Sequence, residues 1–381
     1  MESEQIFKER NTMVVLDVRL DNFYAFSNFH MNLTYPKKIV GSSIPDEHLD
    51  GYPNFRYKKV NVIMGANAAG KTTFGRMLMK IFNFMSRTNF DFLIDAINDT
   101  SKDASFALDM ASSNTMYHID CTVSPPEGKV YTAKNIALEI RSTAIRPKDS
   151  YESCLKRLLA APCERKGNFA DELSKLASLD WMFEYPKDTG RILDLPNNSK
   201  AFCEILENLL RALDPAIQKV EISKDVKNAY VVRSARKSII LQNGESFDTD
   251  FLSSGTKAGV EIANVIFSLR NGMCTFYYCD EKFPYIHSDI EKAVLSLMID
   301  CLHPNDQIFF TTHNTDILEM DLPKHAFMFL RKNIADTDCP ITCVDASSFL
   351  KRSTDSLKNA VENDLFSTAP SVDLIFAIAN S

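Results

Sequence analysis

The sequence has no long hydrophobic run. Its longest apolar stretches, such as residues 273–279, contain tyrosines and are far shorter than the roughly 20 residues that cross a bilayer. The first 13 residues are charged and contain no apolar segment of the kind that a signal peptide requires. We therefore expect a cytoplasmic protein without a membrane partner.

Glycine and proline are scarce, with 12 and 15 residues in a chain of 381, and no segment is of low complexity. The fractions of hydrophobic residues (45%) and charged residues (24%) are those of a globular protein, which excludes disordered and collagen-like chains. The nine cysteines lack paired CxxC spacing, which favours free thiols in a reducing compartment. The length predicts about two domains, or one core fold with a large insertion.

Positive charge is also in deficit, because 43 Lys and Arg face 50 Asp and Glu for a net charge of −7. This balance argues against a wholly cationic nucleic-acid-binding protein, although it leaves room for one basic face. The candidates for such a face are Arg141, Arg146, Lys148, Lys156, Arg157, Arg233, Arg236 and Lys237. Each of these groups is more often a solvated surface charge, so nucleic acid is a partner that the sequence does not favour.

The hydrophobic pattern predicts an α/β protein. A buried strand over residues 59–64 precedes a Gly-containing turn and an apolar helix, and two strands are expected between residues 13 and 33. Three segments with period two, near 106–110, 117–123 and 136–140, predict an antiparallel meander. Further predicted helices cover 151–161, 171–179, 200–213, 257–269 and 288–301, and further predicted strands cover 220–222, 230–241, 274–279 and 307–311.

The strongest motif is a complete GxxxxGK[ST] loop between the predicted strand and helix. We expect nucleotide-binding residues at Gly65, Ala66, Asn67, Ala68, Ala69, Gly70, Lys71, Thr72 and Thr73. In such a loop, backbone N–H groups and the helix N-terminus bind phosphates, and the lysine reaches the β- and γ-oxygens. The Thr72 hydroxyl is the expected ligand of Mg²⁺. The loop predicts ATP and Mg²⁺ as cofactors.

Two acids follow the apolar strand that ends near Cys279. In a P-loop enzyme the first acid, here Asp280, organises the metal shell, and the second, Glu281, polarises the attacking water. A later buried strand ends in Thr311, Thr312 and His313, which predicts a histidine contact to the γ-phosphate. A histidine at a strand end is otherwise usually structural.

A turn of small residues lies 27 residues before Asp280 and opens an apolar helix. Ser253, Ser254 and Gly255 could form a second anion site there, because a hydroxyl, an N–H group and the helix dipole would point at a phosphate. The alternative is an ordinary N-capped helix. The position of the turn favours the anion site.

The order of these motifs, GANAAGKT, LSSGTK, CDE and TTH, resembles the nucleotide-binding head of ABC-type ATPases. More narrowly, the sequence is similar to the stand-alone AAA/ABC ATPases of OLD, Septu and PARIS-like phage-defence systems, also in its opening RLDNFYAFSNFHMNL and in His287, which lies seven residues beyond Asp280. The resemblance implies an ABC-type head, a mixed sheet flanked by helices, with an inserted antiparallel and helical arm.

The resemblance also implies roles for individual residues. Lys71, Thr72 and Asp280 would hold Mg-ATP, Glu281 would be the general base, and His313 would be the switch histidine. Ser253 and Gly255 would contact the γ-phosphate bound by the opposite subunit, so that a homodimer encloses ATP.

Two features depart from the family. The proline that directly follows the acidic pair in transporters is displaced, giving Lys282, Phe283 and Pro284. No glutamine occurs between Gly65 and Gln218, although ABC heads usually place a glutamine in that interval to sense the γ-phosphate. Another polar residue would then ligate the metal, or the coupling between the arm and the nucleotide is altered.

The motif positions divide the chain into three expected parts. Residues 1–90 form the first half of the head, 91–245 the arm, and 246–381 the second half with the signature, the Walker B acids and the switch histidine. Only 68 residues follow His313, fewer than a fused Toprim nuclease needs. Two DxD triplets, at 248–250 and 336–338, could imitate a metal pair, but their places argue against a built-in nuclease.

Two functions follow from these expectations. The first is an ATPase that senses infection, through a phage trigger protein, and controls a separate operon-encoded effector such as a Toprim or HNH nuclease. The alternative is a RecF/SMC-like DNA-binding ATPase in DNA repair, using the basic cluster 233–237 and the arm. A nucleotide-binding scaffold without turnover is a third possibility.

Overall fold

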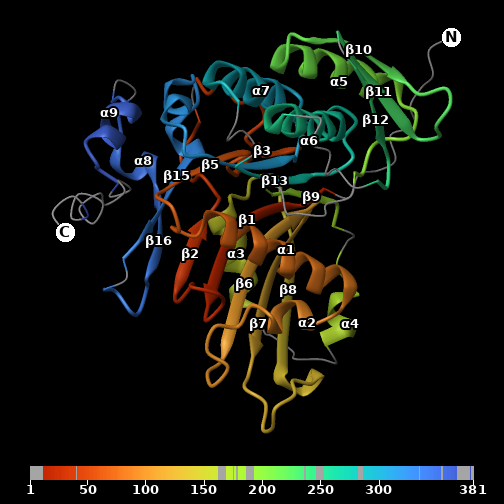
Figure 1. Cartoon of the computed structure of the whole chain (residues 1–381). Coiled ribbons are helices and arrows are strands. Elements are labelled where there is room, and N and C mark those ends of the chain that lie inside the picture. The colour runs from red at the N-terminus through yellow and green to blue at the C-terminus, as the bar shows by residue number, and fades with distance from the viewer. Residues whose placement is uncertain are drawn as a thin grey trace.

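The computed structural model describes residues 12–39, 41–161, 169–174, 176, 179–185, 193–235, 237–245, 253–281, 286–333, 335–352, 355–366 and 378. Its core is a six-stranded sheet in the order β16-β15-β5-β14-β13-β9 (Figure 1). β9 (Trp181–Glu184), β13 (Phe276–Asp280), β14 (Gln307–Thr311), β5 (Val60–Met64) and β15 (Phe327–Lys332) are parallel, and β16 (Ile341–Asp345) is antiparallel to β15. Every residue of β5, β13 and β14 is buried, because other layers cover both faces of these strands.

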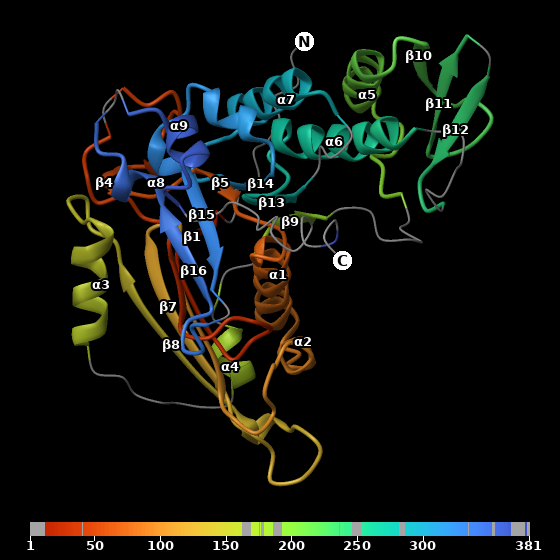
Figure 2. The same ribbon diagram turned by 60° about the vertical axis from the view of Figure 1, so that its left-hand side comes forward.

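A second sheet, entirely antiparallel, lies against one face of this core. It contains β2 (Phe29–Asn32), β1 (Val14–Asp21), β6 (Ala104–Ser112), β7 (Thr115–Val123) and β8 (Ile136–Ala144), in that order. Helix α1 (Lys71–Arg87) packs between the two sheets, since its Phe74 and Ile81 share a hydrophobic cluster with Leu108 of β6 and Phe309 of β14. Figure 2 shows the antiparallel sheet extending away from the core beside α1 and the short helix α2 (Asp91–Ile94).

Three helices cover the opposite face of the core sheet. They are α5 (Lys200–Leu213), α6 (Ser254–Arg270) and α7 (Ser288–Asp300), and they share a second large cluster with β5, β13 and β14. A three-stranded sheet of β10 (Ile217–Ile222), β11 (Ala229–Ser234) and β12 (Ser238–Gln242) packs against α5 (Figure 1). The single strand expected over residues 230–241 is thus two strands, because the chain reverses at a hydrogen bond from Ser234 N–H to the Lys237 carbonyl.

The remaining elements pack around the two large sheets. Helix α3 (Tyr151–Ala160) and the hairpin of β3 (His48–Leu49) and β4 (Tyr52–Arg56) cover the outer face of the antiparallel sheet. Helix α4 (Phe169–Leu173) is shorter than the helix expected over residues 171–179. The short helices η1 (Ala133–Asn135), η2 (Thr315–Glu319), η3 (Lys324–Ala326), α8 (Ala346–Phe349) and α9 (Leu357–Glu362) complete the described chain.

The expected α/β class, with a mixed sheet flanked by helices, is confirmed, and so is the antiparallel meander. The meander is not separate from the first 90 residues, since β6 pairs with β1 over nearly its whole length. β9, which the sequence did not predict, pairs with β13 in the core sheet. Residues 91–245 therefore contribute to both large sheets, and the expected division into a head and an arm stays a prediction.

Two further findings concern membrane spans and cysteines. No helix in the described ranges has both the length and the apolar composition needed to span a bilayer. The eight described cysteines are free thiols; Cys121, Cys154 and Cys279 are buried and the other five are half-buried. Cys163 lies outside the described residues.

Candidate functional site

The GxxxxGK[ST] loop connects β5 to α1 in a conformation that depends on its glycines. A Cβ atom at Gly65 would lie 2.4 Å from the Leu330 carbonyl oxygen, so no larger residue fits there. Gly70 precedes α1 with a φ of 103°, and Ala68 also has a positive φ of 61°. Asn67 and Ala68 are exposed, and Ala69 is buried beneath them. Thr72 and Thr73, in the first turn of α1, are half-buried, and the N-terminus of a helix attracts anions.

Lys71 is held back against this loop. Its ammonium group donates hydrogen bonds to the carbonyl oxygens of Gly65 at 2.9 Å and Ala66 at 3.4 Å, and its side chain is only 4% exposed. Burial lowers the pKa of Lys71, and the carboxylates of Glu281 and Asp280 oppose this shift. Lys71 is therefore a buried cation that lies 3.8 Å from Glu281. Its ammonium group could release the two loop carbonyls and bind an anion instead.

Asp280 is the centre of the site. It ends β13 with no exposed surface, and its two carboxylate oxygens each accept a hydrogen bond of 2.6 Å, one from Thr72 Oγ1 and one from Thr311 Oγ1. Burial raises the pKa of Asp280, and the bonds from Thr311 and Thr72 oppose this effect. A hydroxyl and a carboxylate are hard oxygen donors of the kind that Mg²⁺ selects, so the residues present fit this ion.

Glu281 follows directly and has a strained backbone, with a φ of 42°. Its N–H group donates to Thr311 Oγ1 at 3.0 Å, and its Oε1 lies 2.6 Å from Nε2 of His313. The same Nε2 lies 3.2 Å from Lys71 Nζ. When Nε2 carries the ring hydrogen it donates to Glu281, and its contact with Lys71 is then not a hydrogen bond. Lys282, Phe283 and Pro284 lie outside the described residues.

These contacts bring together the residues predicted from three distant motifs. Lys71 and Thr72 come from the loop after β5, Asp280 and Glu281 from the end of β13, and His313 from the end of β14. The strands are parallel neighbours, so their carboxyl ends meet at one edge of the sheet.

Ser253, Ser254 and Gly255 lie at the start of α6, as expected. Ser253 caps the helix by accepting a hydrogen bond of 3.1 Å from the Thr256 N–H group, as an ordinary N-cap does. Ser253 and Ser254 are exposed, and Gly255 is half-buried. Within the described ranges, no hydrogen bond or ion pair joins these three residues to the P-loop. Their role as a second anion site stays a prediction, and the triplet at 248–250 lies outside the described residues.

Three residues to which the sequence gave no role of their own support the site. The Tyr278 hydroxyl donates a 2.7 Å hydrogen bond to the Lys71 carbonyl, and its ring fills the space beside Gly75, where a Cβ atom would lie 2.3 Å from the ring. Thr311 joins Asp280 to Glu281. Alternation along β13 could have identified Tyr278, since residues 276, 278 and 280 share the face toward α1.

Glu291 of α7 is the third of these residues. Its buried carboxylate accepts hydrogen bonds from Thr312 Oγ1 at 2.9 Å and Asn314 Nδ2 at 2.6 Å, the two neighbours of His313. Burial raises the pKa of Glu291, against the effect of these two bonds. The group borders a cavity of about 460 Å³ that is also lined by Glu281, Ser288 and His313. No sequence motif marks Glu291, because its partners belong to another element.

The sequence has no glutamine between Gly65 and Gln218, so other side chains surround the site. Gln218 is exposed on β10, in the separate three-stranded sheet. Cys279 of β13 is level with Glu184 of β9, so Tyr185 follows β9 at the level of Asp280. The Arg76 guanidinium lies 5.9 Å from the centre of the Tyr185 ring, and burial together with Asp280 raises the pKa of this phenol. Tyr185 is thus the side chain that β9 brings toward the site.

Three of the candidate cations for a basic face are paired with carboxylates. Arg157 lies 2.6 Å from Asp149, Arg233 lies 2.7 Å from Glu221, and Arg141 pairs with Glu139. Arg236 lies outside the described residues. The triplet 336–338 lies in the β15–β16 connection, where Asp336 accepts a hydrogen bond from the Asp338 N–H group.

Comparisons with known proteins find similar structures but no similar sequence. No family model matches the sequence, and no curated protein matches it. Among solved structures, an SMC head bound to the C-winged helix domain of ScpA has a TM-score of 0.48 at 13% identity, covering 88% of this chain and 99% of that one. The SMC head domain from Thermotoga maritima gives 0.44 at 11% identity, covering 87% and 98%.

The recombination mediator RecF, solved with the nucleotide analogue ATPrS, gives a TM-score of 0.43 at 10% identity, covering 88% of this chain and 99% of that one. All three scores are below 0.5 and all three identities are below 25%.

Proposed function

We propose that this chain is a Mg²⁺-dependent ATPase of the ABC type. The observation that carries the proposal is the convergence of Lys71, Thr72, Asp280, Glu281 and His313 at the carboxyl edge of the core sheet. A phosphate-binding loop, a metal-binding pair of oxygens and a carboxylate held by a histidine are the groups that nucleotide hydrolysis requires.

The chemistry assigned to each residue follows from its surroundings. The P-loop N–H groups and Lys71 would bind the β- and γ-phosphates, and Thr72 and Asp280 would hold Mg²⁺, which supplies charge neutralisation when bound. Glu281 would accept a proton from the attacking water, since threonine hydroxyls occupy both oxygens of Asp280 but not the carboxylate of Glu281. His313 would orient Glu281 and contact the γ-phosphate.

The start of α6 supports a two-chain arrangement. In one chain Ser253, Ser254 and Gly255 form no described bond to the P-loop, whereas a second copy facing the first would bring its α6 N-terminus to the phosphate. We propose a homodimer that encloses ATP. The motif order further supports an ATPase that reports infection to a separate effector such as a Toprim or HNH nuclease, with a phage protein as trigger.

Phosphate release from Mg-ATP tests the activity. Lys71→Ala should lower hydrolysis by about 100-fold or more, because the buried cation at the phosphates is removed. Lys80→Ala, on the same helix, is the matched control and should change little. EDTA should stop hydrolysis and added Mg²⁺ should restore it. A wild-type rate no higher than that of Lys71→Ala would refute the proposal.

The biological role needs its own experiment. Cells carrying the chain with its neighbouring genes should plate phage less efficiently than cells carrying Lys71→Ala in the same operon, and the chain should co-purify with a neighbour-encoded protein. Equal plating with both versions, together with a chain that purifies alone, would exclude the defence role while leaving the ATPase intact.

A further inference from the structure

A second cavity, of about 400 Å³, lies where three connections meet. They are the chain after β2, the start of η3, and the chain after α8. Five cations line this cavity, and they are Lys37, Lys38, Lys324, Lys351 and Arg352. We refer to it as the cationic groove. None of these residues is among the basic candidates from the sequence, because the pairs 37–38 and 351–352 are far apart in the chain.

The positive charge of the cationic groove is compensated only in part. No Asp or Glu is among the described residues that line it, although acids outnumber basic residues in the whole chain. Within the described part of the chain, Lys37, Lys38 and Lys351 form no ion pair, and Lys324 has only a 4.0 Å contact with Asp355. A concave surface with one sign of charge concentrates its potential and attracts anions.

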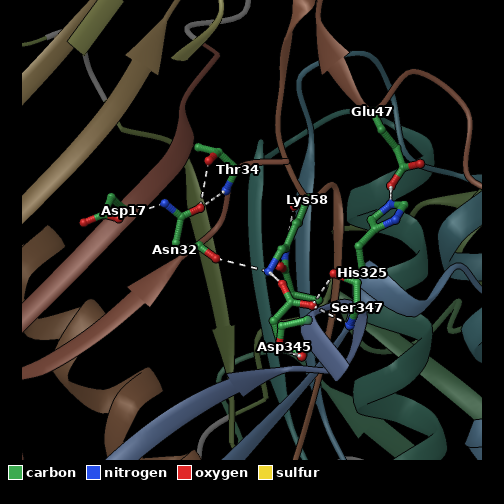
Figure 3. A network of polar contacts seen from close by, with 10 residues as sticks. Asp17, Asn32, Thr34, Glu47, Lys58, His325, Asp345 and Ser347 are labelled. Atoms are coloured by element: carbon green, nitrogen blue, oxygen red, sulfur yellow. Dashed lines mark hydrogen bonds and ion pairs between the residues drawn. The ribbon is translucent and has the colours of Figure 1, made fainter. Parts of the chain in front are cut away.

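Two other acids near the groove, Glu47 and Asp345, are engaged by other groups. Glu47 accepts from His325 at 2.6 Å and from Ser42 Oγ at 2.6 Å, and it is buried. Asp345 pairs with the buried Lys58 and accepts from the Ser347 N–H group at 2.9 Å. Figure 3 shows both pairs, Glu47 with His325 and Lys58 with Asp345, and Ser347 beside Asp345. These bonds occupy both carboxylates with partners outside the five groove cations.

The cationic groove is distinct from the nucleotide site. The P-loop follows the carboxyl end of β5, and its Gly65 lies against Leu330, near the carboxyl end of β15. Lys324 precedes β15, and Tyr35 is bonded to Arg56 just before β5. Because β5 and β15 are parallel, the groove lies at the amino edge of the core sheet and the P-loop at the carboxyl edge.

We propose that the cationic groove is a second phosphate-binding site, for a ligand with several phosphate groups. Its volume is in the range of small-ligand sites, and lysine and arginine are the side chains that bind phosphate oxygens. Tyr35 also lines the groove, with its ring stacked on His325 at 4.4 Å between centroids. The phosphates come from a free polyphosphate or nucleotide, or from the backbone of a single nucleic-acid strand that enters the groove.

Binding of inorganic tripolyphosphate, measured by calorimetry, tests the site. The full-length Lys71→Ala chain is used so that the P-loop does not contribute. The Lys71→Ala chain should bind tripolyphosphate, and the added change Lys37→Glu/Lys38→Glu should weaken binding by about tenfold for each lysine replaced. Lys129→Glu/Lys134→Glu alters charge equally on the exposed β7–β8 connection and should leave binding unchanged.

A fluorescein-labelled oligo-dT of about ten nucleotides distinguishes the two sources. Tighter binding of the oligonucleotide than of tripolyphosphate, with a salt dependence that falls in Lys37→Glu/Lys38→Glu, identifies a nucleic-acid strand. The reverse order identifies a free polyphosphate. Circular dichroism melts establish that the variants fold, and Lys351→Glu/Arg352→Glu provides a second test if one variant does not.

Three outcomes would overturn the proposal. They are no tripolyphosphate or oligonucleotide binding by Lys71→Ala, equal binding by the groove variants, and an equal decrease in the β7–β8 control. None of them bears on ATP hydrolysis at the P-loop, so this site and the proposed ATPase can fail independently.

Discussion

The carboxylate of Glu281 lies 2.6 Å from the Nε2 atom of His313, although the two residues follow the ends of different strands. The contact exists because β13 and β14 are parallel neighbours in register, with Asp280 opposite Thr311. The contact orients the Glu281 side chain beside Lys71 of the P-loop. Under the proposed function, this pair would serve hydrolysis rather than nucleotide binding alone.

Glu281→Gln should separate binding from hydrolysis. The amide keeps the shape of the side chain but cannot accept a proton, so ATP hydrolysis should fall by about 100-fold or more while nucleotide affinity is kept. Phosphate release and equilibrium nucleotide binding measure the two quantities. Glu127→Gln, at an exposed site on the β7–β8 connection, is the control. Unchanged hydrolysis in Glu281→Gln would mean that another group activates water.

Mixing two inactive variants should restore activity if two chains share each site. Lys71→Ala damages the P-loop, and Ser253→Arg blocks the exposed start of α6. In a mixed dimer, one site contains both changes and the other contains neither, so an equal mixture should recover roughly a quarter of the wild-type rate. Phosphate release from the mixture and from each variant alone provides the measurement. A mixture as inactive as its components would argue for a site completed within one chain.

Gly75 should tolerate no side chain. The ring of Tyr278, which is fully buried, occupies the position of a Cβ atom at Gly75, so Gly75→Ala forces α1 away from β13. Overpacking of this kind should lower the free energy of unfolding by about 1–3 kcal/mol. Urea denaturation measures the decrease. Gly128→Ala, where no atom lies within 4 Å of the added Cβ, should change stability little.

Stability should depend on pH through Glu291. Burial raises the pKa of Glu291 in the folded chain, so the folded state binds this proton more tightly than the unfolded state does. The ionised carboxylate of Glu291 destabilises the folded state. This destabilisation is absent below the pKa of about 4.5 that Glu291 has in the unfolded chain, and it grows as the pH rises through the raised pKa of the folded chain. Glu291→Gln removes the charge, so its melting temperature should rise relative to wild type across this window.

Melting curves between about pH 4 and pH 8 measure that difference. Glu127→Gln removes a carboxylate from the exposed β7–β8 connection, and its melting temperature should follow that of wild type at every pH. A constant offset between Glu291→Gln and wild type would show that the effect arises from the hydrogen bonds to Thr312 and Asn314 rather than from titration.

Much of the site could be predicted from the sequence because its motifs are local. The P-loop, the acidic pair after β13 and the histidine after β14 each combine a buried strand with a polar turn, and such patterns are visible in one segment. Parallel strands then guarantee that the polar ends meet at one edge. The sequence alone thus determined the α/β class and the residues that converge on Asp280.

Other features required the tertiary structure, because their partners are far apart in the chain. β9 is too short to be recognised by its pattern, and only its pairing with β13 places Tyr185 level with Asp280. Glu291 is an ordinary helix residue until Thr312 and Asn314 face it. The five cations of the groove come from three connections that are far apart in the chain. Their combined positive potential depends on distances in space, which the spacing of residues in the sequence does not reveal. Local chemistry was therefore set by the sequence, and the burial and charge that modulate it were decided by the fold.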